Sequence, residues 1–170
     1  MNNAPARLAR IERPLYVCFL ITMAVPLVDF VGNVYPFELS SLGWRYGAEG
    51  LLSSFTLMPL MALALFTAVA AIADNRRTLR ILAIFALAAG SLLVVLSLSF
   101  VLDAVQLRRQ APADSLPLFD LGVIKALAKH LITLVGLVWI GLSGLGASQK
   151  TETAGKSREA APLITNSSKA

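Results

Sequence analysis

At 170 residues the chain is long enough for one domain, but 56% of its residues are hydrophobic and 15% are charged, against about a quarter charged in soluble domains. This composition excludes an ordinary soluble protein and indicates an integral membrane protein. The net charge of +5 is concentrated in three short segments, as in the orientation signal of a membrane protein and unlike a nucleic-acid-binding surface. We therefore expect the lipid bilayer and other membrane proteins, or self-association, as partners, and no nucleic acid.

The chain begins with a short polar segment, residues 1–14, which carries three arginines. An apolar run follows at 15–34 and is interrupted by a single charge, Asp29. A basic start before an apolar run is also typical of a cleaved signal peptide. However, the run is long and no small-x-small cleavage site follows it at a suitable distance. We expect an uncleaved first transmembrane span.

Two uncharged runs joined by a basic turn form the centre of the chain. Leu51–Ala73 and Ile81–Leu102 contain 23 and 22 residues without a charge, and Asp74–Arg80 separates them. A helix rises about 1.5 Å per residue, so either run crosses the roughly 30 Å hydrocarbon core of a bilayer. Backbone groups in lipid must hydrogen-bond within their own segment, which requires a helix at this length. We expect a transmembrane hairpin with spans at about 51–73 and 80–103.

Two longer connections and a last span complete the predicted elements. Tyr35–Gly50 contains aromatic residues that suit the membrane interface, and we expect it to be a loop. Asp103–Leu118 mixes charges with prolines, and Ala104–Gln110 within it is expected to form one or two helical turns at the surface. Asp120 has the residue type of an N-cap for a fourth span at about 121–147.

The distribution of Lys and Arg predicts the orientation of the spans. With the N-terminus inside, ten of the fifteen cations lie on the inner side. Cytoplasmic segments carry such an excess, so we expect a multi-pass protein of the cell (inner) membrane with both termini in the cytoplasm. Residues 148–170 are polar and without periodicity, which predicts a disordered cytoplasmic tail. The predicted fold is all-α: an up-down bundle of four transmembrane helices.

Five ionisable side chains are expected near the outer face of the bundle. Counting about 1.5 Å per residue from the inner edge places Asp29 roughly 21 Å, His130 roughly 25 Å and Lys129 roughly 27 Å into the membrane. Asp103 and Lys125 both fall at about 33 Å, at the interface. We therefore expect Asp29 to pair with Lys129 or His130 on the fourth helix, and Asp103 to match Lys125.

Ionisable groups inside a bilayer are costly and suggest function, such as a proton relay or a ligand site. The structural alternative for this cluster is a set of neutralising pairs that fix helix register, with Lys125 extending to the headgroups. His130, the single histidine, has the same two interpretations. It is either a ligand of haem iron or chlorophyll-type magnesium, or a hydrogen-bonded interfacial side chain. A homodimer or a partner subunit would supply a second histidine.

Pro26 and Pro59 lie near the middle of their spans and are candidate helix kinks. Two kinks at similar depth would open a small cavity of the kind that transporters use, although prolines are also tolerated in membrane helices without function.

No sequence motif points to catalysis. The chain has no Gly-rich phosphate loop, metal-ligand spacing or nucleophile elbow, and its one cysteine, Cys18, lies in an apolar run. We expect a protein that is not an enzyme and holds no metal or cofactor. The leading hypothesis is an accessory or scaffold subunit of a membrane assembly. The alternatives are an oligomeric transporter of an ion or small solute that uses Asp29, and a haem- or chlorophyll-type cofactor-binding subunit that uses His130.

Overall fold

The computed structural model describes residues 4–159, and side chains between residues 14 and 147. This part of the chain is helical and contains no β-strand. Its elements are α1 (Ala4–Val34), α2 (Leu42–Phe55), α3 (Leu57–Ile72), α4 (Arg76–Arg108), the short 3-10 helix η1 (Ala113–Ser115) and α5 (Leu116–Glu159). Four stretches are long and apolar enough to cross a membrane: Pro14–Val34, Leu42–Ile72, Arg76–Arg108 and Ala113–Ala147.

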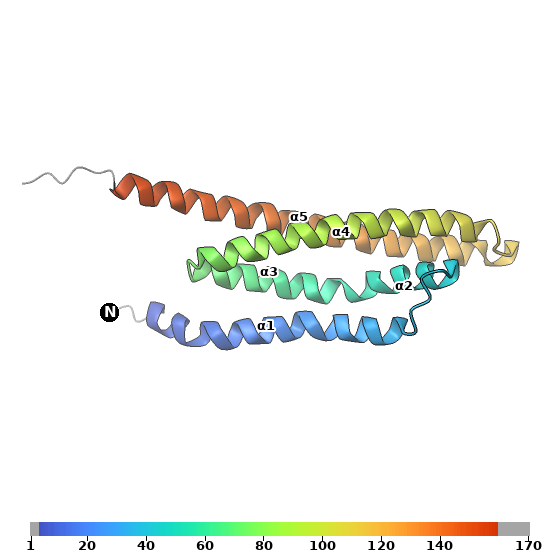
Figure 1. Ribbon diagram of the computed structural model, residues 1–170, viewed down its shortest axis with the longest axis horizontal. Coiled ribbons are helices and arrows are strands. Elements are labelled where there is room, and N and C mark those ends of the chain that lie inside the picture. Colours follow the sequence, from blue (N-terminus) through green and yellow to red (C-terminus); the bar gives the residue numbers. More distant parts are fainter. Residues whose placement is uncertain (1–3, 160–170) are drawn as a thin grey trace, which may run out of the picture.

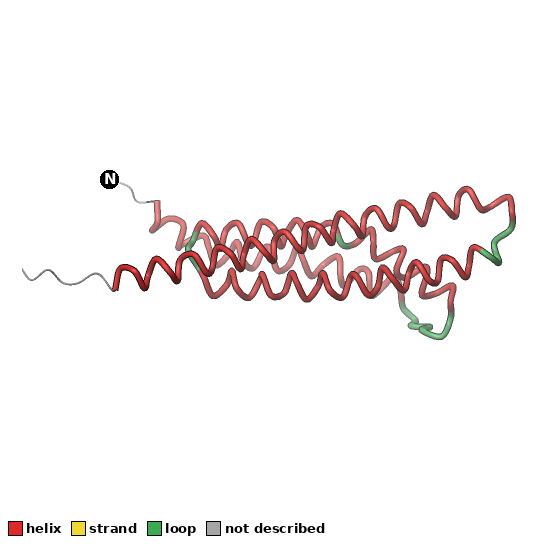
Figure 2. The backbone as a smooth tube through the Cα atoms, turned by 90° about the horizontal axis from the view of Figure 1, so that it is seen from above, coloured by secondary structure: helices red, strands yellow, loops and turns green. Residues whose placement is uncertain are grey.

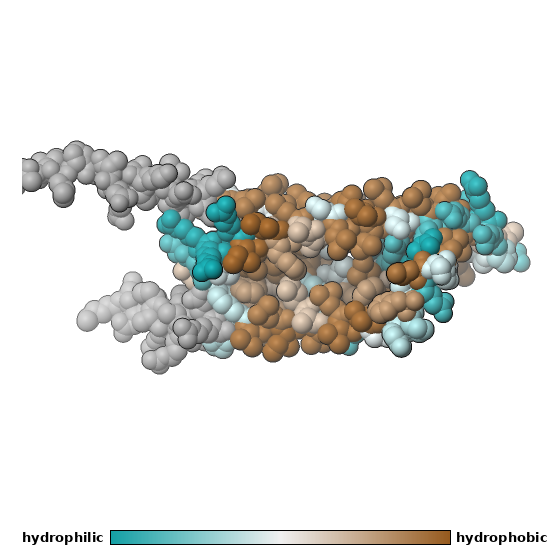
Figure 3. Space-filling view, viewed as in Figure 1, coloured by the Kyte–Doolittle hydropathy of each residue, from teal (hydrophilic) through white to brown (hydrophobic). Residues whose placement is uncertain are grey.

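The four spans run up and down along one axis (Figures 1 and 2), so the predicted four-span bundle is confirmed. The start of α1, the turn between α3 and α4 and the last part of α5 lie at one end, which we call the basic end. The connections 35–41 and 109–115 lie at the opposite end, the loop end. An apolar band covers the middle of the bundle and polar surface flanks it on both sides (Figure 3). This pattern fits a bilayer around the band.

Helices α3, α4 and α5 pack against one another and form the core. Glycines on α5 allow α4 to come close: a Cβ added at Gly144 would lie 3.0 Å from the Cβ of Ala83, and one at Gly141 would lie 2.6 Å from Cγ of Leu87. Such small residues are typical of membrane-helix contacts because they bring two backbones together. On α4 the matching residues are small too, and Ala83 and Ala86 have no exposed surface.

Helix α1 is attached on one side of this core. It packs against α3 and α2, but it does not pack against α4 or α5 within the described residues. The contact with α3 is aromatic, because Tyr16 and Phe19 lie 4.7 and 5.9 Å from the ring centre of Phe66. Near the loop end, Phe30 of α1 lies 6.2 Å from Phe55 of α2. Ring contacts on one face of α1 therefore attach it to α3 and α2.

The second span is interrupted at Thr56, between α2 and α3. Pro59 explains the position, since proline has no N–H to donate to the carbonyl of residue 55 and its ring clashes with that carbonyl. The hydroxyl of Thr56 donates to the free carbonyl of Ser53 at 3.3 Å. By contrast, α1 continues through Pro26 without interruption, and a kink there stays a prediction.

Several helix boundaries differ from those predicted. Helix α2 begins at Leu42, so the connection expected at Tyr35–Gly50 shrinks to 35–41. Helix α4 continues to Arg108, which absorbs most of the turns expected at Ala104–Gln110. In each place one arginine that suggested a loop is paired with an aspartate of another helix: Arg45 with Asp103, and Arg108 with Asp120.

The last helix also exceeds its predicted limits. It begins at Leu116, so Asp120 lies inside α5 and is not an N-cap. At the other end α5 reaches Glu159, where we expected a disordered tail from Ser148. Gln, Lys, Arg, Glu and Ala make up seven of the twelve residues 148–159; these residue types are good helix formers and allow a polar extension. Residues 160–170 of the expected tail lie outside the described residues.

Candidate functional site

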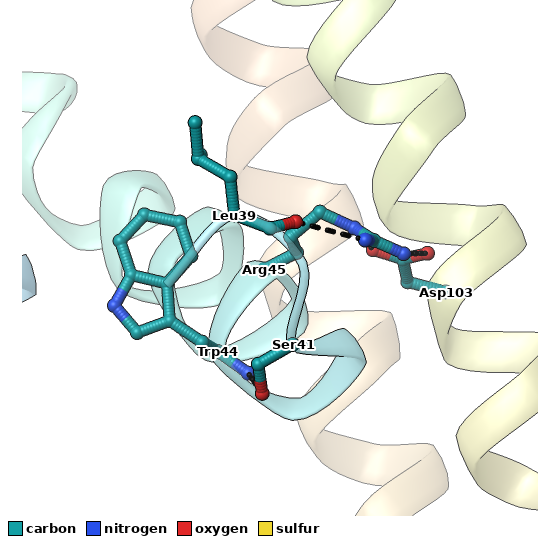
Figure 4. A network of polar contacts seen from close by, with 5 residues as sticks. All are labelled: Leu39, Ser41, Trp44, Arg45 and Asp103. Atoms are coloured by element: carbon teal, nitrogen blue, oxygen red, sulfur yellow. Dashed lines mark hydrogen bonds and ion pairs between the residues drawn. The ribbon is translucent and has the colours of Figure 1, made fainter. Parts of the chain in front are cut away.

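A bidentate ion pair joins α2 to α4 at the loop end (Figure 4). Nε and Nη2 of Arg45 donate to the two carboxylate oxygens of Asp103 at 2.9 and 3.0 Å, and Nη1 donates to the carbonyl of Leu39 at 3.0 Å. Asp103 is only 4% exposed. The predicted match between Asp103 and Lys125 is therefore wrong: Lys125 is exposed, and Arg45, assigned to a loop, is the partner.

The local sequence around Arg45 positions its guanidinium. The hydroxyl of Ser41 accepts from the backbone N–H of Trp44 at 3.3 Å and caps the first turn of α2. The indole Nε1 of Trp44 donates to the carbonyl of Val34 at 3.0 Å, which ties the end of α1 to the start of α2. The loop of residues 35–41 is thus fixed at both ends, and its Leu39 carbonyl lies where Arg45 binds it (Figure 4).

Three aromatic rings from three helices stack beside this ion pair. Tyr46 of α2 lies between Phe100 of α4 and Phe119 of α5, with ring centres 5.1 and 5.2 Å away and planes within 15° of parallel. Phe100 is 1% exposed, and the ring of His130 meets it nearly edge-on at 6.0 Å. The stack closes the loop end of the core around His130.

His130 is buried and has no polar partner. It is 2% exposed, and neither ring nitrogen has a hydrogen bond. Oε2 of Glu49 is the one other buried side-chain nitrogen or oxygen between residues 14 and 147 without a partner. An unpaired buried polar group costs about 1–3 kcal/mol. His130 is a core residue and does not meet Asp29. Of the two interpretations from the sequence, the hydrogen-bonded interfacial side chain is wrong, and the cofactor ligand stays a prediction.

Asp29 lies on the exposed face of α1. The predicted pair with Lys129 or His130 is wrong, because α1 does not pack against α5. Among the described side chains, no hydrogen bond or ion pair reaches the Asp29 carboxylate; Asn33 donates at 2.7 Å to the backbone carbonyl of Asp29 instead. Counting along the chain matched the depths of these residues, but it could not show which helices are neighbours.

Of the two lysines of the predicted cluster, Lys125 is exposed and Lys129 has a partner of its own, while a further ion pair, outside the predicted cluster, joins α4 to α5. Nζ of Lys129 donates to the hydroxyl of Ser54 on α2 at 3.0 Å. Asp120 accepts from Nε and Nη2 of Arg108 at 2.8 and 3.0 Å, which ties α4 to α5 beside their connection. Asp29, Asp103, Lys125, Lys129 and His130 thus do not form one site.

The outward face of α1 carries a stripe of polar and small residues, which we call the α1 stripe. Its members recur at three- or four-residue spacing, all are exposed, and they are Cys18, Thr22, Val25, Asp29, Gly32 and Asn33. Residues with this spacing share one face of a helix. The residues of α1 that pack on the core, such as Phe19 and Tyr16, lie on another face. A Cβ added at Gly32 would meet nothing within 4 Å, so the stripe is open to the surroundings.

In the described part of the chain, no three His, Cys, Asp or Glu side chains come together as a metal-binding group. Comparison with protein-family models, with curated proteins and with solved structures found no match.

Proposed function

We propose that the protein is a non-catalytic accessory or scaffold subunit of a membrane assembly, and that the α1 stripe contacts a transmembrane helix of its partner. In this proposal both termini are cytoplasmic and the loop end faces outward. The single observation that carries the proposal is the exposed, unpaired carboxylate of Asp29 within an apolar span.

The cost of that carboxylate is the physical argument. Asp29 lies five residues before the end of α1 at Val34, or about 7 Å along the helix axis. An aspartate at the centre of a membrane helix costs about 2.5–3.5 kcal/mol on insertion scales, and the cost is lower toward the ends, where Asp29 lies. Such residues usually pair with an opposite charge or face water. Since no cation among the described side chains binds Asp29, a Lys or Arg on a partner helix would complete an ion pair with it.

The exposure of α1 also supports its outward face as the surface that contacts a partner. None of the residues in the most apolar 18-residue stretch of α1 is buried, whereas 22–28% are buried in the corresponding stretches of the other three spans. The α1 stripe also combines the two features that favour association in lipid: small residues for close approach, and hydroxyl or amide side chains for hydrogen bonds between helices.

Substitution of Asp29 tests the proposal. The protein is tagged, solubilised from its native membrane in a mild detergent and isolated with its partners, which are quantified by mass spectrometry. We expect Asp29→Asn to reduce, and Asp29→Lys to abolish, recovery of a specific membrane protein. A Lys→Asp or Arg→Asp substitution in the partner should restore recovery with Asp29→Lys. Asp114→Asn, an exposed carboxylate on η1, is the matched control. Equal recovery with all variants would contradict the proposal.

The same observation supports a second candidate, an oligomeric transporter in which several copies of α1 surround a path and Asp29 binds the ion or solute. In the first candidate α1 contacts a different membrane protein, and in the second it contacts other copies of this chain. Crosslinking between copies of this chain, together with solute flux that Asp29→Asn abolishes in liposomes, would favour transport. The third hypothesis, a haem- or chlorophyll-type cofactor on His130, predicts a Soret or chlorin absorption band in the purified assembly.

A further inference from the structure

An apolar cavity of about 570 Å³ lies beside the interruption at Thr56. All four spans contribute to its wall: Leu27 and Phe30 from α1, Pro59 from α3, Leu92 from α4 and Thr133 from α5 are among the lining residues. This volume is in the range of sites that hold a small organic molecule, about 300–1,000 Å³. The cavity exists because α1 packs on α3 and leaves a space toward α4.

The wall of the cavity excludes a polar occupant. Its lining is apolar except for the hydroxyls of Thr56 and Thr133. These two oxygens lie 3.2 Å apart and also bond to the backbone carbonyls of Ser53 and Lys129. Their hydrogen-bonding capacity is largely used within the protein, so the site offers shape and dispersion contacts instead of charge or hydrogen bonds.

The cavity opens sideways, through the surface that faces the surroundings of the bundle. Leu27 on α1 is 42% exposed, and Phe85 and Leu92 on α4 are 46% and 60% exposed. These three residues mark the mouth, between two helices that do not pack against each other. The apolar band of Figure 3 covers these spans. In a membrane, hydrocarbon chains therefore surround the mouth.

We propose that this cavity binds one acyl chain of a membrane lipid, which fills the space between α1 and α4. Lipid tails are as apolar as the lining residues, so the transfer itself gives little hydrophobic gain. The driving force is the packing of a space whose walls would otherwise lack contacts. The bound chain would then supply the contact with α4 that α1 does not make through its own side chains. This site lies on a different face of α1 from the α1 stripe and does not depend on the partner proposed above.

Native mass spectrometry of the purified chain tests the site. After detergent washing that removes bulk lipid, the wild type should retain roughly one phospholipid per chain. Ala88 is exposed and lines the cavity, so Ala88→Phe should fill the mouth and abolish this adduct. Ala128, an exposed alanine of α5 outside the lining, gives the control Ala128→Phe, which should retain the lipid. Absence of lipid from the wild type, or equal retention by both variants, would overturn the proposal.

Fluorescence quenching provides a measurement that does not depend on the folding of Ala88→Phe. In a chain with both native tryptophans replaced by phenylalanine, Leu92→Trp places the reporter at the mouth, and Leu98→Trp, on the same helix, places it on lipid-facing surface outside the lining. Phospholipid brominated on its acyl chain is added to the delipidated protein in detergent. We expect quenching of Leu92→Trp to saturate at roughly one equivalent, with little quenching of Leu98→Trp. Equal quenching of the two variants would show only non-specific contact with lipid and would overturn the proposal. A dimer of the chain in which Leu92→Trp is protected from quenching would overturn it too, because a second copy would then fill the cavity.

Discussion

Helix α1 and the α4–α5 pair are built in opposite ways. The α4–α5 pair is held along its length by glycine and alanine contacts and is tied beside its connection by Arg108 and Asp120. Helix α1 is held by a few aromatic contacts on one side and exposes an unpaired carboxylate on another. The charged side chains Arg108 and Asp120 of the pair bind each other, whereas the carboxylate of Asp29 on α1 has no partner among the described side chains. In the function proposed above, the core provides stability and α1 provides recognition.

The largest loss of stability is expected at the ion pair that fixes α2 on the core. Arg45→Ala leaves the carboxylate of Asp103 buried without its cation. Breaking a fully buried pair costs about 3–5 kcal/mol, and because the Arg45 side chain is 35% exposed we expect a smaller loss, about 2–3 kcal/mol. Reversible unfolding in micelles, with helix content as the signal, measures the loss. Arg109→Ala, at an exposed cation beside the end of α4, is the control. A double-mutant cycle with Asp103→Asn should show coupling between the two residues, and purely additive losses would argue against the pair.

A smaller loss is expected from overfilling the α4–α5 contact. A side chain at Gly141 would meet Leu87 at 2.6 Å and the backbone carbonyl of Ala83 at 3.3 Å. Overpacking of this kind typically costs about 1–3 kcal/mol, and we expect this loss for Gly141→Leu in the same unfolding measurement. Gly122→Leu lies on the same helix with nothing within 4 Å of its Cβ and should leave stability close to the wild-type value. If both variants lose equally, close packing at Gly141 does not explain the result, because leucine has a higher helix propensity than glycine and should not by itself destabilise either position.

The Arg108–Asp120 pair should contribute less to the free energy of unfolding than its short, bidentate hydrogen bonds suggest. The two side chains are 56% and 39% exposed, and exposed ion pairs contribute only about 0.2–1 kcal/mol. Arg108→Ala should therefore lower the free energy of unfolding by about 0.5 kcal/mol, and added salt should reduce the difference. A loss as large as that of Arg45→Ala would mean that this pair is buried in the folded protein.

The smallest effect on the isolated chain is expected at Asp29. Because no side chain of the bundle binds its carboxylate, Asp29→Asn should change the free energy of unfolding by less than about 0.5 kcal/mol. If Asp29 were paired as the sequence predicted, Asp29→Asn would clearly lower the free energy of unfolding, and adding Lys129→Gln would restore part of the loss. A large destabilisation of the purified monomer would contradict the assignment of Asp29 to recognition.

The apolar runs predicted four spans because their length and lack of charge depend on the bilayer alone. The ends of the spans were less predictable. Arg45 and Asp103 read as loop residues by charge, but their mutual pairing keeps both inside helices. Ser41 was the available signal for the start of α2 at Leu42. Serine is a preferred N-cap residue, and its side chain accepts from the backbone N–H of the third residue of the helix, which here is Trp44.

The candidate site was predicted only in part for a related reason. Depth along the axis follows from counting residues, and it correctly placed Asp29 inside the first span. Which helices are neighbours depends on packing between faces, and α1 packs on α3. His130 was likewise misjudged, since its burial under Phe100 depends on the ring stack between three helices. Pro59 was the exception, because its missing N–H acts locally and interrupts the helix wherever the neighbours lie.

The central claim is that α1, and not the core, contacts the partner. A photo-crosslinking amino acid placed at Val25, one turn from Asp29 and 51% exposed, reports on the α1 stripe. The same group at Val95, which is 61% exposed on α4, is the control. In native membranes we expect one discrete adduct with a partner membrane protein from position 25, none from position 95, and loss of the adduct when Asp29→Lys is added. Equal adducts from both positions, or an adduct from position 95 alone, would contradict the account.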